Sequence, residues 1–154
     1  MESVQITENE ILKMFQDFNA NMRKKTFRTV LRQSSNILRK QAILNLKHYV
    51  SNIDRKDKWG NTLRKGIVTK IAKNLKSATV HILANFKLKF FEMGTNVRYN
   101  KRIHTIKLKK RRYTGSINAT HFFTTAKKQT ETTVFNSIRT NLEATIRKIN
   151  EKHK

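Results

Sequence analysis

The sequence contains no cysteine and no proline, and it has only four glycines. Without cysteine the chain has no disulfide framework, no thiolate metal ligand and no cysteine nucleophile, which fits a reducing compartment. No apolar run approaches the roughly 20 residues that a membrane-spanning helix needs. The first residues are polar and acidic, unlike a signal peptide. We therefore expect a protein made and used in a cytoplasm, or in a particle assembled there.

Acidic residues are also scarce. The chain has ten Asp and Glu residues and 34 Lys and Arg residues, which gives a net charge of +24 on 154 residues. Its hydrophobic content is only 37%. Such a chain repels itself unless an anionic neighbour compensates the charge. Nucleic acid, an acidic membrane surface and an acidic protein are the candidate neighbours. The length suits a single domain, 1–154, with a genuine core.

Residue patterns typical of catalysis are missing too. The five histidines show no metal-ligand spacing, and no two acids bracket an expected cleft. The glycines are isolated, so there is no phosphate-binding loop, and the serines lack the context of a nucleophile elbow. We expect no enzyme, no metal and no cofactor.

The N-terminal region, 1–52, has a helical pattern. Thr7 and Glu10 match a capping box, and apolar residues follow at helical spacing without a proline or glycine as far as Val50. The pattern predicts either one long helix or two helices with a bend near Asn21–Lys25. The opposite face is basic, and a solvated face and a binding face explain it equally well. It carries Arg23, Lys24, Lys25, Arg28, Arg32, Arg39, Lys40 and Lys47.

The region 60–117 has strand character. After the turn signal at Gly60, Ile67–Ala72 and Ala78–Ala84 read as short strands, and Phe86–Phe91 reads as the third strand of an antiparallel meander. Gly94 is expected to turn the chain. We interpret the end of this stretch as a structural anchor, consisting of Phe90, Phe91, Glu92, Gly94 and Thr95.

A basic arm, 97–113, follows this anchor and contains no acid. Weak strand character and flanking glycines predict an extended hairpin or long arm. Its cations are candidate contacts to a DNA backbone or to a neighbouring subunit, with neither favoured. These candidates are Arg98, Lys101, Arg102, Lys107, Lys109, Lys110, Arg111 and Arg112.

A second helical pattern occupies 120–150, with Thr120 or Asn118 as the expected N-cap. The whole order predicts an α+β domain, in which a small antiparallel β-sheet packs against long N-terminal and C-terminal helices and carries an extended basic hairpin. Within it, a buried Glu92 needs a partner, and Arg98 and Arg112 are the nearest candidates. Glu92 would then fix the base of the arm to the sheet.

The order of three motifs resembles the neck proteins of tailed bacteriophages, the tail-completion or head–tail joining family. The motifs are Gly-Asn-Thr-Leu-Arg-Lys-Gly-Ile at Gly60–Ile67, Phe-Phe-Glu-Met-Gly-Thr at Phe90–Thr95, and Phe-Phe-Thr-Thr-Ala at Phe122–Ala126. They cover the middle of the chain, and the flanking helices match by pattern.

The resemblance implies a structural subunit of the virion neck. Such subunits assemble as a ring, commonly a hexamer, that joins head and tail around the DNA channel. The implied partners are copies of the chain, a connector or stopper protein, a tail terminator and the passing double-stranded DNA. The implied location is the virion, assembled in the host cytoplasm, with no membrane. The alternative is a free nucleic-acid-binding protein that uses the arm and the basic helix faces, and a membrane-surface role is less favoured because those faces have few aromatics.

Overall fold

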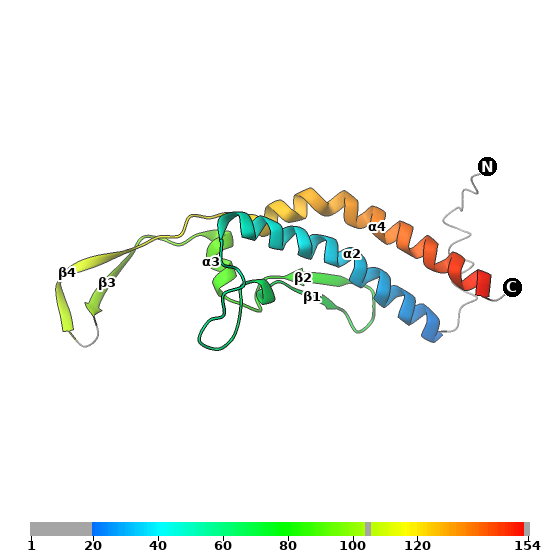
Figure 1. Ribbon diagram of the computed structural model, residues 1–154, viewed down its shortest axis with the longest axis horizontal. Helices are drawn as coiled ribbons and strands as arrows, with labels where there is room; N and C mark the ends of the chain where they lie inside the picture. Colours follow the sequence, from blue (N-terminus) through cyan, green and yellow to red (C-terminus); the bar gives the residue numbers. More distant parts are fainter. Residues whose placement is uncertain (1–19, 104–105, 153–154) are drawn as a thin grey trace. The chain divides into compact units, whose positions relative to one another are not determined.

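The computed structural model describes residues 20–103 and 106–152 (Figure 1). Its elements are α2 (Ala20–Tyr49), the 3-10 turn η1 (Arg64–Gly66), β1 (Val68–Ile71), β2 (Ala78–His81), α3 (Lys87–Met93), β3 (Arg98–Ile103), β4 (Ile106–Gly115) and α4 (Phe122–Lys152). Two small antiparallel sheets, β1–β2 and β3–β4, accompany the helices. The predicted α+β class, with long N-terminal and C-terminal helices, is confirmed. The predicted capping box at Thr7 lies outside the described residues.

The described chain divides into two compact units. The first holds the described residues up to Lys40, the β1–β2 hairpin from Thr69 to Val80, and α4 from Thr130 onward. The second holds Gln41–Val68 and His81–Gln129. Both long helices contribute residues to both units. The expectation of a single domain stays a prediction.

Helix α2 runs without a break through all 30 of its residues. Over the described residues it therefore passes through Asn21–Lys25 as one helix, because no proline or glycine lies in it. In the first unit Val30 is buried, and the buried Ser34 hydroxyl lies 3.2 Å from that of Ser137 on α4. None of the described helices has the length and apolar character of a membrane span.

The second unit has its own core and a polar seam between the two long helices. The Asn45 side chain donates to the carbonyl of Phe122 and to the side-chain oxygen of Gln129, each at 3.1 Å. The core of this unit consists of fully buried apolar side chains. They are Ala42, Leu46, Ile53, Ile67, Leu88, Phe122 and Ala126.

The predicted third strand, Phe86–Phe91, is wrong, because this segment forms helix α3. Its sequence fits both the two-residue period of a strand and the 3.6-residue period of a helix. Alternation separates the apolar residues from Lys87 and Lys89, but helical spacing places Leu88 and Glu92 on one buried side. Phe86 and Phe90, also four residues apart, form an edge-to-face pair on the exposed side, with ring centroids 5.9 Å apart. The predicted three-stranded meander is therefore only the two-stranded β1–β2 hairpin.

Candidate functional site: the basic hairpin and its base

The basic arm is an antiparallel hairpin of β3 and β4, as its flanking glycines predicted. Tyr99 lies opposite Tyr113, and their rings meet edge to face with centroids 5.8 Å apart. The register shifts between Arg98 and Tyr99 and again between Asn100 and Arg102. Such irregularities increase the twist of a two-stranded ribbon.

The hairpin presents its side chains to solvent. Every side chain described from Asn96 to Thr114 is exposed, including Tyr99 at 54% and Tyr113 at 59%. Of the candidate contact residues, Arg98, Lys110 and Arg112 are exposed, whereas only the backbone is described for the others. Those others are Lys101, Arg102, Lys107, Lys109 and Arg111.

The two ends of the hairpin are joined by hydrogen bonds at its base. The amide of Thr95 donates to the carbonyl of Ile117 at 2.8 Å, and the amide of Ile117 donates to the Thr95 hydroxyl at 2.9 Å. One step further, the amide and the hydroxyl of Thr120 both donate to the carbonyl of Phe91, at 2.9 and 2.8 Å. The chain therefore leaves α3 and returns to α4 at one fixed place.

Gly94 makes this close approach possible. Its backbone has φ 74° and ψ −178°, a conformation that is essentially restricted to glycine. A Cβ atom at this position would also lie 2.8 Å from the amide nitrogen of Ala119 and 3.0 Å from the carbonyl oxygen of Ile117. The turn expected at Gly94 stays a prediction, but a glycine is required here for two independent reasons, its backbone conformation and the close packing.

Glu92 is the buried charge at the base of the hairpin, only 6% exposed. Its carboxylate accepts hydrogen bonds from the amide of Phe123 at 2.8 Å, the amide of Thr124 at 3.1 Å and the Thr124 hydroxyl at 2.6 Å. The predicted pairing with Arg98 or Arg112 is wrong. The partner is instead the N-terminus of α4, where the first amides lack intrahelical acceptors and the helix dipole favours an anion.

The prediction that Thr120 or Asn118 caps the N-terminus of α4 is also wrong, because Glu92 provides the cap. The Thr120 hydroxyl is used on Phe91, and Asn118 is exposed. His121, the residue before the helix, has φ 48°, and its amide donates to the carbonyl of Glu92 at 3.3 Å. A carboxylate some thirty residues earlier in the chain therefore caps α4, so no local sequence signal reveals it.

The other anchor residues occupy different environments. Phe91 and Thr95 are half-buried, whereas Phe90 is 38% exposed and not part of the core. The expectation that Phe90 belongs to the anchor assumed that Phe86–Phe91 is a strand. Glu92, Gly94 and Thr95 do meet at the hairpin base.

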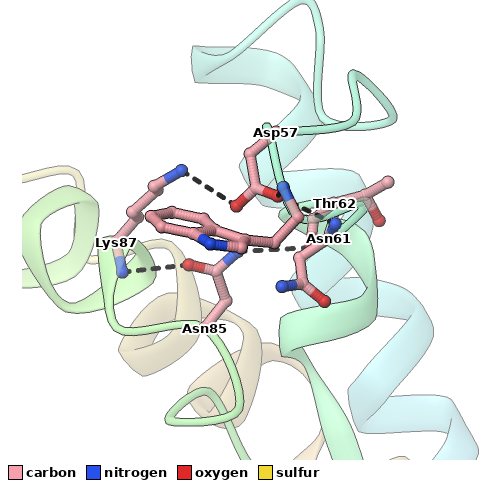
Figure 2. A network of polar contacts seen from close by, with 6 residues as sticks. Asp57, Asn61, Thr62, Asn85 and Lys87 are labelled. Atoms are coloured by element: carbon pink, nitrogen blue, oxygen red, sulfur yellow. Dashed lines mark hydrogen bonds and ion pairs between the residues drawn. The ribbon is translucent and has the colours of Figure 1, made fainter.

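A polar network that the sequence reasoning missed holds the start of α3 (Figure 2). Asp57 accepts hydrogen bonds from the amides of Trp59 and Asn61, and its second oxygen lies 3.2 Å from the Lys87 ammonium. The backbone hydrogen bond from Asn61, together with Lys87, lowers the pKa of Asp57 below 3.8. The signal was Asp57 placed three residues before Gly60, a typical turn arrangement.

Asn85 connects the same network to η1. Its side chain accepts from the Lys87 amide at 3.1 Å and donates to the Thr62 carbonyl at 3.4 Å (Figure 2). A Cβ on Gly66 would lie 2.5 Å from the Asn85 Cβ and 2.6 Å from the Leu88 side chain. The Gly60–Ile67 stretch is therefore packed directly against the start of α3.

The arrangement suits binding and mechanical attachment. Among the described residues, no group of three His, Asp or Glu side chains is placed to hold a metal ion. What this region offers chemically is a set of exposed cations and two tyrosines on a hairpin with a fixed base. Compared with known proteins, the chain matches no family model, no curated protein and no solved structure.

Proposed function

We propose that this protein is a structural subunit of a tailed-bacteriophage neck. Copies of it assemble as a ring, a hexamer, around the DNA channel and join the head to the tail. The partners in the particle are further copies, a connector or stopper protein and a tail terminator. The protein works by assembly and without a cofactor.

The observation that carries this proposal is the exposed basic hairpin with a fixed base. Its described side chains are all exposed, so the rest of the chain gains little from it. Its base, by contrast, is held by the Thr95–Ile117 hydrogen bonds, by Gly94 and by the buried Glu92. An exposed element with a fixed origin is suited to reach a neighbouring molecule.

The motifs behind the family resemblance support the same proposal. Gly66 packs against α3, and Glu92 in the second motif bonds Phe123 and Thr124 in the third. The second and third stretches thus meet at the hairpin base, and the first packs against the start of α3.

A free nucleic-acid-binding protein is the second candidate, and the net charge of +24 favours it. The two functions differ in assembly. A ring-forming subunit builds a defined oligomer or enters a particle, whereas a free binder stays monomeric and binds DNA with an affinity that falls steeply as salt rises.

The deciding experiment locates the protein in tailed particles produced by cells that carry its gene. Purified particles should contain the protein in a fixed copy number by quantitative mass spectrometry. Antibody labelling in the electron microscope should place it between head and tail. Particles that lack the protein, together with a monomer that binds DNA in light-scattering and titration experiments, would contradict the neck role and favour the free binder.

A further inference from the structure

The N-terminal half of α2 carries a row of cations. Lys24, Arg28 and Arg32 follow one another at intervals of four residues, and all three are exposed. At 1.5 Å per residue the row is about 12 Å long on one side of the helix. Lys25 and Gln33 lie beside it and line the same shallow surface hollow.

No acidic residue balances this row on its own helix. Helix α2 contains no Asp or Glu at all. In the part of the chain that the structure describes, ion pairs join Arg64 to Asp54, Lys87 to Asp57 and Arg139 to Glu143, and the three cations of the row take part in none of these. Like charges four residues apart destabilise a helix, so folding alone does not favour this row.

Helix α4 shows that the row is not simply a result of a basic composition. Lys127 and Lys128 precede Glu131 by four and three residues, and Arg139 pairs with Glu143 at 3.2 Å. The cations of α4 are therefore interspersed with acids, as on an ordinary solvated helix. The cations of α2 are not.

The surroundings of the row decide between possible anionic partners. In the N-terminal half of α2, Val30 is only 1% exposed and Phe27 is 39% exposed, so little apolar surface lies beside the row for insertion into a lipid surface. The hollow is lined only by polar and charged residues and lacks the apolar anchor on which protein interfaces usually depend. A row of lysine and arginine on one helix, next to an amide side chain, matches the donors that contact phosphate oxygens.

We propose that Lys24, Arg28 and Arg32 form a binding site for the phosphate backbone of double-stranded nucleic acid, independent of base sequence. The site contains no residue of the basic hairpin. It does not depend on the proposed neck role, because a single copy of the chain presents the complete row.

The test compares two triple variants of the full chain. K24Q/R28Q/R32Q removes the row, and K127Q/K128Q/K148Q removes the same charge from exposed positions of α4. Binding to a fluorescent DNA duplex of mixed sequence is measured by anisotropy over a range of salt concentrations. Light scattering at each salt concentration records the oligomeric state, so that a failure of ring assembly is seen separately.

Each phosphate contact contributes about 0.9 to the slope of log K against log salt concentration. In the α2 variant the affinity should therefore fall less steeply with salt, with a slope about 2.7 less negative than in the wild type. The α4 variant should keep a slope near the wild-type value. The charge-retaining variant K24R/R28K/R32K should keep the wild-type slope.

Equal slope changes in both glutamine variants would overturn the site, because they would reflect overall charge only. An unchanged slope in the α2 variant would overturn it as well. Loss of binding to a polyglutamate peptide without a change in the DNA slope would assign the row to an acidic protein instead, and would also contradict the proposal. Circular dichroism verifies that each variant keeps its helix content, which glutamine supports.

Discussion

The carboxylate of Glu92 lies 2.8 Å from the backbone amide of Phe123, although the two residues are separated by 31 positions in the chain. This contact attaches the end of α3 to the start of α4, on the two sides of the basic hairpin. The segment that carries the hairpin therefore begins and ends at a buried helix cap that a charged side chain provides.

Replacing Glu92 should destabilise the protein. Glu92→Ala leaves the first amides of α4 without an acceptor and should lower the free energy of unfolding by about 2 kcal/mol. Glu92→Gln should lower the free energy of unfolding by less than Glu92→Ala, because the glutamine oxygen still accepts one hydrogen bond. It loses only the charge and the second acceptor oxygen. Urea denaturation measures both, and Glu131→Ala, at an exposed position of α4, serves as the control.

The basic strands β3 and β4 should also become more sensitive to trypsin in the Glu92→Gln variant. Unchanged cleavage there would show that the cap does not hold the hairpin.

Two glycine variants compare an open turn position with the close-packed base of the hairpin. Gly60 and Gly94 have similar φ values of 77° and 74°, but a Cβ on Gly60 has no neighbour within 4 Å, whereas a Cβ on Gly94 lies 2.8 Å from the Ala119 nitrogen. Gly60→Ala should cost about 1 kcal/mol, from the positive φ alone. Gly94→Ala should cost about 3 kcal/mol or more, because the overlap adds to the strain. Similar costs in thermal unfolding would contradict the close packing at the hairpin base.

Asp57 should make stability depend on acid pH. Its pKa is lowered in the folded protein, chiefly by the Asn61 amide and also by Lys87, so the unfolded chain takes up the proton first. The stability that Asp57 contributes is therefore present above pH 3.8, the pKa of the unfolded chain. It is lost as the pH falls through the lowered pKa of the folded state. Lys87→Met should raise the pKa of Asp57 only part of the way, because the Asn61 hydrogen bond remains. NMR titration of the Asp57 carboxyl carbon measures this shift, and a full return to the ordinary value would contradict the leading role of Asn61.

Removing the hairpin should separate folding from function. A chain in which Arg98–Thr114 is replaced by a short glycine-serine linker keeps Gly94, Thr95 and Ile117. Because the described side chains of the deleted part are exposed, the melting temperature should change by only a few degrees. Under the proposed function this variant should no longer enter tailed particles. The double variant Tyr99→Ser/Tyr113→Ser tests whether the aromatic pair carries part of that contact. Global unfolding of the deletion variant would mean that the hairpin belongs to the core.

The sequence alone indicated the elements whose signals are long or repeated. Helices α2 and α4 each extend over some thirty residues without proline or glycine, so a 3.6-residue period could be recognised. The hairpin was predictable from Gly94 and Gly115 on either side of a basic stretch with few apolar residues. The class of the fold and the positions of its long helices both follow from the order and type of residues.

The tertiary structure alone decided the nature of α3 and the partner of Glu92. Seven residues are too few to distinguish a period of two from one of 3.6, so Phe86, Leu88 and Phe90 fitted a strand as well as a helix. The helix lets Leu88 and Glu92 share a buried side, and there Glu92 meets the unpaired amides of α4. Local spacing contains no information about such a contact, because its energy arises only when segments distant in the chain come together.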